Sequence, residues 1–124
     1  MKIAIIAHDN KKPDMVAFIM KRLAFFKNPK IRIFATGTTG KHIENSGLDV
    51  ECLKSGPLGG DAQIASLLVD GNIDVVLFFI DPLYSHPHEV DIHMLMRLCN
   101  VYDIPLATNH STAKMIIDSI KEVN

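Results

Sequence analysis

The segment IDVVLFFI, from Ile73 to Ile80, is the most strand-like stretch of this sequence of 124 residues. A continuous apolar run of this length is typical of a strand that is covered on both faces, as in a parallel sheet. Asp81 and Pro82 end the run, because proline has no backbone N–H to donate to a neighbouring strand. The longest uninterrupted apolar part, residues 75–80, is too short to cross a bilayer, so we expect no membrane partner.

Strand-like and helical segments alternate along the rest of the chain. The other predicted strands are Lys2–Ala7, Ile31–Ala35, Val50–Leu53 and Ile104–Ala107. The predicted helices run from Pro13 to about Phe26, from the Thr36–Gly40 run to Gly47, over about 62–70, over about 91–102, and from Asn109 to near Val123. This alternation predicts an α/β fold in which residues 1–124 form one domain, with helices on both faces of a five-stranded parallel sheet. Spacing alone leaves the strand order open between 3-2-1-4-5 and 2-1-3-4-5.

Apolar residues at helical spacing predict which side chains face the core. In the first helix they are Met15, Phe18, Ile19, Leu23 and Phe26, and in the fourth Ile92, Leu95, Met96, Leu98 and Cys99. Cys52 and Cys99 form no C-x-x-C motif, so we expect two reduced, buried cysteines in a cytoplasmic protein.

The composition excludes several classes of function. A hydrophobic content of 48% with 22% charged residues is that of a soluble globular protein rather than a disordered chain. Thirteen basic against fourteen acidic residues give a net charge of −1, so no basic excess indicates a nucleic acid as partner. The apolar run 3–7 is too short for a secretory signal.

The loop SGPLGGD, from Ser55 to Asp61, carries three glycines just before a helical segment. Glycines let successive backbone N–H groups form an anion-binding concavity, and a helix that starts there adds its own N–H groups. A carboxylate beside a bound phosphate is repelled, so Asp61 needs a reason to be there, and removal of a proton from a phosphorylated substrate is one. The alternative is that Asp61 simply caps the helix.

Two further polar clusters follow the first two predicted strands, and they should share the same edge of the sheet. In the first, with His8 and Asp9, Lys12 offers a point charge to a phosphate, unless it is merely a solvated loop lysine. In the second, Thr36–Gly40, hydroxyls and N–H groups gather at a helix start. The alternative to phosphate binding by this second cluster is that its threonines cap the helix.

The loop after IDVVLFFI carries His86, Pro87 and His88, followed by Asp91. A metal site is disfavoured, because a His-x-His pair needs strand geometry to chelate with both rings and a proline separates these two. A single imidazole that polarises a carbonyl and is oriented by Asp91 fits better. The remaining histidines, His42, His93 and His110, are interpreted as surface or structural residues.

Together these residues resemble the methylglyoxal synthase-like domain family over nearly the whole chain. The matching strings are AHD from Ala7 with Lys12, ATGTTG from Ala35, SGPLGGD from Ser55, DPL from Asp81, PH from Pro87 with Asp91, and IPLATN from Ile104. The resemblance implies a three-layer α/β/α domain of strand order 3-2-1-4-5 that assembles as a homohexamer. It also implies a cytoplasmic lyase that converts glycerone phosphate into methylglyoxal and phosphate without a metal or organic cofactor, and that inorganic phosphate inhibits cooperatively. Members usually continue past the last helix, whereas this sequence stops at Asn124, so contacts made by such a tail are not carried over.

The resemblance also assigns roles to individual residues. It makes Asp61 the proton donor and acceptor, and it makes Asp91 a second carboxylate that supports His88. The implied substrate contacts are His8, Lys12, Thr36, Gly37, Thr38, Thr39, Ser55, Gly56 and His88. Two alternatives stay open: a regulatory domain of the same fold that binds a phosphorylated ligand without catalysis, and a zinc hydrolase that uses His86, His88 and Asp91.

Overall fold

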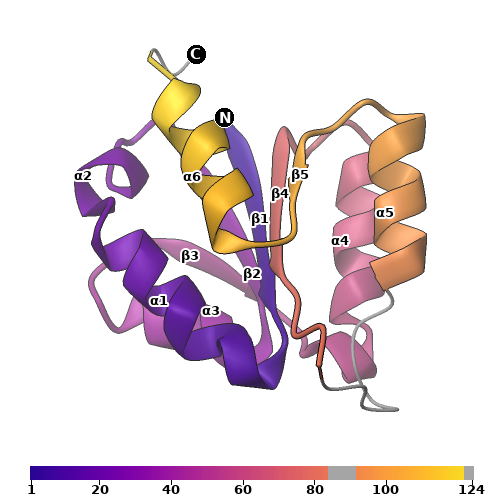
Figure 1. Cartoon of the computed structure of the whole chain (residues 1–124), viewed down its shortest axis with the longest axis horizontal. Coiled ribbons are helices and arrows are strands. Elements are labelled where there is room, and N and C mark those ends of the chain that lie inside the picture. Colours follow the sequence, from indigo (N-terminus) through magenta and orange to yellow (C-terminus); the bar gives the residue numbers. More distant parts are fainter. Residues whose placement is uncertain (84–91, 122–124) are drawn as a thin grey trace.

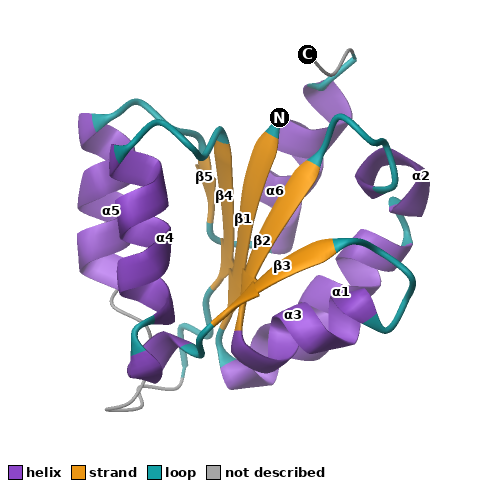
Figure 2. Cartoon of the chain, turned by 180° about the vertical axis from the view of Figure 1, so that it is seen from behind, coloured by secondary structure: helices purple, strands orange, loops and turns teal. Residues whose placement is uncertain are grey.

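A computed structural model describes residues 1–83 and 92–121 of the chain. Five parallel strands form one sheet in the order β3-β2-β1-β4-β5 (Figures 1 and 2). The strands are β1 (Lys2–Ala7), β2 (Arg32–Thr36), β3 (Val50–Leu53), β4 (Val75–Phe79) and β5 (Leu106–Ala107). The order 3-2-1-4-5 is therefore confirmed, and the alternative 2-1-3-4-5 is excluded.

Helices cover both faces of this sheet, as Figure 2 shows. The α-helices are α1 (Lys12–Met20), α2 (Leu23–Phe26), α3 (Gly37–Glu44), α4 (Gly60–Val69), α5 (Ile92–Val101) and α6 (His110–Ser119). Two short 3-10 helices, Asp9–Lys11 and Gly56–Leu58, precede α1 and α4. Helices α4 and α5 lie on one face, and α1, α3 and α6 lie on the other. No helix within residues 1–83 and 92–121 is long and apolar enough to traverse a membrane.

Strand β1 shows why the central strands are continuously apolar. Its side chains alternate between the two faces, so Ile3 and Ile5 pack under α1, α3 and α6, whereas Ala4 and Ile6 pack under α4 and α5. All four are fully buried. A strand covered on both sides has no solvent face on which polar residues would be favoured. This explains why apolar and polar residues do not alternate along β1.

The helix predicted from Pro13 to Phe26 is two helices in the structure. Helix α1 ends at Met20 and α2 starts at Leu23, because Arg22 leaves the helical conformation with φ −123° and ψ 33°. The Arg22 guanidinium lies 4.3 Å from the centre of the Phe18 ring and 3.3 Å from the Asp118 carboxylate. These contacts tie the break to α6, and Leu23 is only partly buried.

Three expectations about the helices and the core are wrong. Cys52 is exposed, because β3 is an edge strand on which only Val50 is buried. Met96 is 40% exposed, because α5 buries the single stripe formed by Leu95 and Cys99. Helix α6 ends at Ser119 rather than near Val123.

Helix α4 allows a matched test of packing. Leu68 is 1% exposed in the core, whereas the next residue, Val69, is 43% exposed. Leu68→Ala should lower the free energy of unfolding by about 2–5 kcal/mol, because it removes buried methyl groups and leaves a cavity. Val69→Ala should change it by about 0.5 kcal/mol or less. Urea unfolding at one fixed protein concentration measures both, and equal effects would contradict the assigned burial.

Candidate active site

The register of the parallel strands brings the loops after β1, β2, β3 and β4 to one edge of the sheet. Ala7 pairs with Phe79, and Thr36 pairs with Leu53, each at the carboxyl end of its strand. β1 lies between β2 and β4, so the loop that begins at His8 sits centrally. Three of the four predicted polar clusters follow these strand ends within the described residues.

Lys12 connects the first cluster to the second. Its Nζ lies 2.7 Å from the Thr38 hydroxyl oxygen and 2.8 Å from a carboxylate oxygen of Asp9. The side chain is only 25% exposed, so the interpretation of Lys12 as a solvated loop lysine is wrong. The ammonium, partly offset by Asp9, adds positive charge to the positive end of α3, a combination that favours an anion.

Helix α3 begins inside the threonine-glycine run rather than after it. Thr36 occupies the N-cap position in an extended conformation, but its side chain makes no capping hydrogen bond. Thr36 and Thr39 are buried, and the Thr39 hydroxyl has no hydrogen-bond partner among the residues that the structure describes. The capping alternative is therefore wrong for Thr36, and the Thr39 hydroxyl is left for another partner.

In the SGPLGGD loop, a glycine and not the carboxylate caps the following helix. Gly59, with φ +105°, is the N-cap of α4, so Asp61 is the second residue of the helix. One Asp61 oxygen accepts a hydrogen bond of 2.8 Å from the backbone N–H of Ala62. The alternative of Asp61 as the cap is wrong, although the positive end of α4 still favours a carboxylate there.

Two glycines permit the close packing of this loop. A Cβ on Gly60 would lie 2.0 Å from the carbonyl oxygen of Lys54, a distance that no side chain could occupy. A Cβ on Gly37, where φ is +53°, would lie 3.1 Å from the Cβ of Ser55. The second and third clusters are thus in contact through Gly37 and Ser55, as the shared sheet edge predicts.

His8 is buried at the centre of this edge. Its Nδ1 accepts a hydrogen bond of 3.0 Å from the backbone N–H of Asp81, and its ring meets Phe78 edge to face at 5.2 Å. Because Nδ1 acts as the acceptor, a neutral His8 ring carries its proton on Nε2. The ring is therefore fixed in position with Nε2 as its donor.

Asp81 is the residue that the sequence interpretation left out of the site. Its carboxylate accepts hydrogen bonds from the Asn10 amide at 2.9 Å and from the backbone N–H of Leu83 at 3.1 Å. The Asn10 hydrogen bond is the largest cause that lowers the pKa of Asp81 below its ordinary value. Its place directly after β4, at the same edge as His8, was the signal that could have found it.

The fourth cluster cannot be placed in the same way. His88 and Asp91, with His86, lie outside the described residues, so their predicted roles remain predictions. Within the described part of the chain, no group of three His, Cys, Asp or Glu side chains is arranged to hold a metal ion. His42, His93 and His110 are exposed, as expected for surface residues.

Comparisons with known proteins place the chain among related sequences. The family model described as the MGS-like domain matches residues 15–108. The chain is 49% identical over 123 residues to a methylglyoxal synthase of an Exiguobacterium species, covering 98% of this chain and 88% of the relative. It is 50% identical over 121 residues to the methylglyoxal synthase of Carboxydothermus hydrogenoformans, covering 97% of this chain and 98% of the relative. The crystal structure of methylglyoxal synthase from Elizabethkingia anophelis superposes with a TM-score of 0.89 at 43% identity, covering 95% of this chain and 77% of that one.

The hydrogen bond from Asn10 gives a pH prediction. Asn10→Ala should raise the pKa of Asp81, because the carboxylate loses its strongest donor. A lowered pKa in the folded state stabilises the protein above the ordinary pKa, and this stabilisation is lost as the pH falls through the lowered value. The variant should therefore lose less stability on acidification over that range. Carboxyl ¹³C NMR titration measures the shift, with Asp118, held by Arg22, as internal control; an unchanged Asp81 pKa would contradict the assignment.

Proposed function

The chain belongs to the MGS-like domain family, and we propose that it is a lyase that converts glycerone phosphate into methylglyoxal and inorganic phosphate. Relatives named methylglyoxal synthase, 49% and 50% identical over nearly the whole chain, support the proposal. The structural observation that carries it is the 2.7 Å contact between the Lys12 ammonium and the Thr38 hydroxyl. It joins a cation to a helix start, an arrangement suited to a substrate phosphate.

In this proposal the phosphate lies between the starts of α3 and α4. Lys12 neutralises its charge, and hydroxyl and N–H groups from the two loops donate hydrogen bonds to its oxygens. The proposed contacts are His8, Lys12, Thr36, Gly37, Thr38, Thr39, Ser55, Gly56 and His88. The Thr39 hydroxyl, which has no hydrogen-bond partner in the described part of the chain, and the contact between Gly37 and Ser55 support a site shared by both loops.

Asp61 is the proposed base. It removes a proton from the carbon that bears the substrate hydroxyl, which gives an enediolate whose negative charge develops on the former ketone oxygen. We assign the donor to that oxygen to His88, oriented by Asp91, where a developing charge gains most from a positioned donor. A base of this kind accelerates such a step by roughly 10²–10⁴-fold.

Loss of phosphate separates this reaction from an isomerisation. The C–O bond to phosphate must stand roughly perpendicular to the enediolate plane, so that the enediolate electrons form the new double bond as the C–O electrons leave with the phosphate. The released enol then becomes methylglyoxal. The contacts to the phosphate must therefore hold the C–O bond perpendicular to the enediolate plane, in addition to binding the phosphate. A cation that is itself held by both Asp9 and Thr38 is suited to fix this torsion angle.

Several finer features belong to the same proposal. We propose that residues 1–124 act as a single domain, that the protein is cytoplasmic and assembles as a homohexamer, and that inorganic phosphate binds the substrate site and inhibits cooperatively. The reaction as proposed needs no metal or organic cofactor. The alternative is a regulatory domain that binds a phosphorylated ligand. Such a domain would use Lys12 to bind the phosphate but would not need Asp61 as a base.

Asp61→Asn tests the base. The variant should lose at least about 10²-fold in kcat, because an amide cannot take up the proton. It should still bind inorganic phosphate, measured by calorimetry. Asp70→Asn at the exposed C-terminal end of the same helix is the matched control and should keep its activity. Turnover at the unmodified rate in Asp61→Asn would remove Asp61 from this role.

Lys12→Ala tests the phosphate grip. Loss of a hydrogen bond to a charged group costs about 1.5–3 kcal/mol, so KM for glycerone phosphate should rise roughly 10–100-fold. Lys41→Ala, at an exposed position on α3, should leave KM unchanged. Steady-state kinetics decides the point, and an unchanged KM in Lys12→Ala would exclude it as a phosphate ligand.

A further inference from the structure

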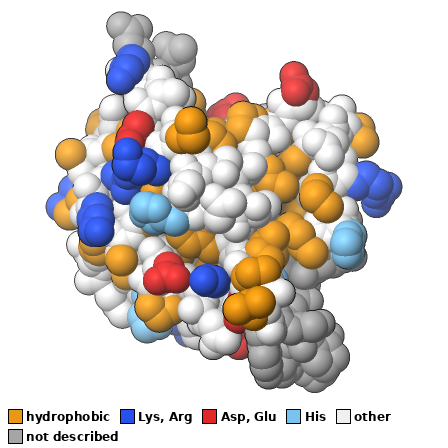
Figure 3. Space-filling model, in the orientation of Figure 1, with side chains coloured by type: hydrophobic (Ala, Val, Ile, Leu, Met, Phe, Trp, Pro, Cys, Tyr) orange, Lys and Arg blue, Asp and Glu red, His pale blue; other side chains and the backbone are white. Residues whose placement is uncertain are grey.

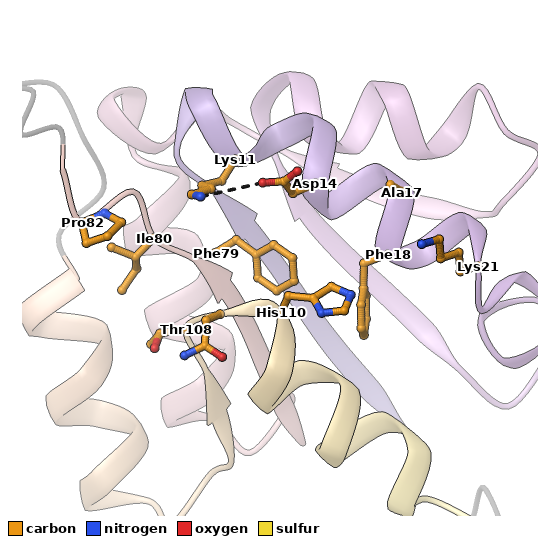
Figure 4. Close-up of a pocket in the computed structure, with 11 residues that line it drawn as sticks. Lys11, Asp14, Ala17, Phe18, Lys21, Phe79, Ile80, Pro82, Thr108 and His110 are labelled. Atoms are coloured by element: carbon orange, nitrogen blue, oxygen red, sulfur yellow. Dashed lines mark ion pairs between the residues drawn. The ribbon is translucent and has the colours of Figure 1, made fainter.

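A cavity of about 630 Å³ lies between α1 and α6, behind the edge that carries the proposed site. Figure 4 shows residues from α1, from the end of β4 and from the start of α6 around it. Its volume falls within the roughly 300–1,000 Å³ that is typical of small-molecule sites. None of its lining residues is among the proposed substrate contacts. We propose that this cavity is a second ligand site, and that it takes a small monoanion with an aromatic or other apolar body.

The floor of the cavity is apolar. Phe18, Phe79 and Ile80 line it together with Ala17 and Pro82 (Figure 4). The Phe18 ring is held in place, because the Arg22 guanidinium lies 4.3 Å from its centre and the His110 ring meets it edge to face at 5.5 Å. Phe18 and Phe79 are almost fully buried, so the apolar surface that a ligand would remove from water comes from Ala17, Ile80 and Pro82 above them.

The rim of the cavity carries a net positive charge. Lys11 pairs with Asp14 at 3.8 Å, so these two charges offset each other. Lys21 forms no ion pair with any residue that the structure describes, and its charge is left over. On this face Lys and Arg side chains are interspersed with Asp and Glu side chains (Figure 3), so the unpaired Lys21 is what leaves a positive charge among the residues that the structure describes. One uncompensated cation beside an apolar floor favours a single negative charge on the ligand.

Hydrogen-bond donors are available on the α6 side. The side-chain oxygen of Asn109 already accepts hydrogen bonds from the backbone N–H and the hydroxyl of Thr112, at 2.9 and 3.0 Å. Its amide nitrogen donates to none of the residues that the structure describes and is the group that remains for a ligand. A carboxylate, which accepts hydrogen bonds and carries one charge, suits a rim made of this amide and Lys21.

The cavity is separate from the phosphate site, although the same chain segments form both. Lys11 lines the cavity, whereas Lys12 contacts Thr38. Ile80 lines the cavity, whereas the backbone N–H of the next residue, Asp81, donates to His8. The cavity shares no lining residue with the proposed substrate contacts, so a ligand there need not displace phosphate.

We would test the proposal with 2-naphthoate as the probe and its uncharged amide, 2-naphthamide, as the control ligand. The intact protein is labelled at phenylalanine rings for NMR titration. Phe79 lines the cavity, whereas Phe34 is buried under the opposite face of the sheet. We expect a saturable shift of the Phe79 ring resonances, no shift of Phe34, and weaker binding of the amide.

Two variants locate the binding. Ala17 is exposed on α1, so Ala17→Trp should be tolerated and should block the cavity, which abolishes the Phe79 shift. Lys21→Glu should weaken 2-naphthoate about threefold or more without altering the affinity for the amide. Lys30→Glu, an exposed lysine that does not line the cavity, should bind 2-naphthoate like the unmodified protein.

Four results would overturn the proposal. They are no saturable Phe79 shift in the unmodified protein, as when a second copy covers the cavity; equal affinity for acid and amide; unchanged binding in Ala17→Trp; and displacement of 2-naphthoate by inorganic phosphate. None of these readouts depends on turnover of glycerone phosphate, so they are independent of the proposed activity.

Discussion

The parallel pairing of β1 with both β2 and β4 is the constraint on which the rest of this structure depends. It covers β1 on both faces and places the carboxyl ends of four strands at one edge. The Lys12 ammonium contacts the Thr38 hydroxyl, and the His8 ring accepts a hydrogen bond from the Asp81 backbone N–H, because the segments that carry these residues all start at that edge of the sheet. Sequence separations of 26 and 73 residues become contacts of 2.7 and 3.0 Å.

Close backbone packing is the second requirement. Gly60 brings the start of α4 against the Lys54 carbonyl, and Gly37 brings the start of α3 against Ser55. The free N–H groups at both helix starts therefore lie along one edge, and a substrate with one phosphate can be held from two sides. Gly37 and Gly60 thus permit these close backbone contacts. The helix-capping role considered for Asp61 is taken by Gly59.

The sequence predicted most of this architecture because its strongest signals are local. Lys2–Ala7 and Val50–Leu53 match the strands to the residue, since polar residues follow each segment directly, at His8 and at Lys54. Contacts between distant segments were not predictable. Arg22, where the helix breaks, contacts Asp118; Cys52 is exposed because β3 is an edge strand; and the backbone N–H of Asp81 donates to His8. Local spacing carries no information on any of these three partners.

Product analysis with the unmodified protein tests the central claim most directly, because the proposed site differs from that of an isomerase in expelling phosphate. Purified protein would be incubated with glycerone phosphate while methylglyoxal, inorganic phosphate and glyceraldehyde 3-phosphate are measured together. The account predicts equal amounts of methylglyoxal and phosphate and no glyceraldehyde 3-phosphate. Isomerisation without phosphate release, or binding without turnover, would contradict it.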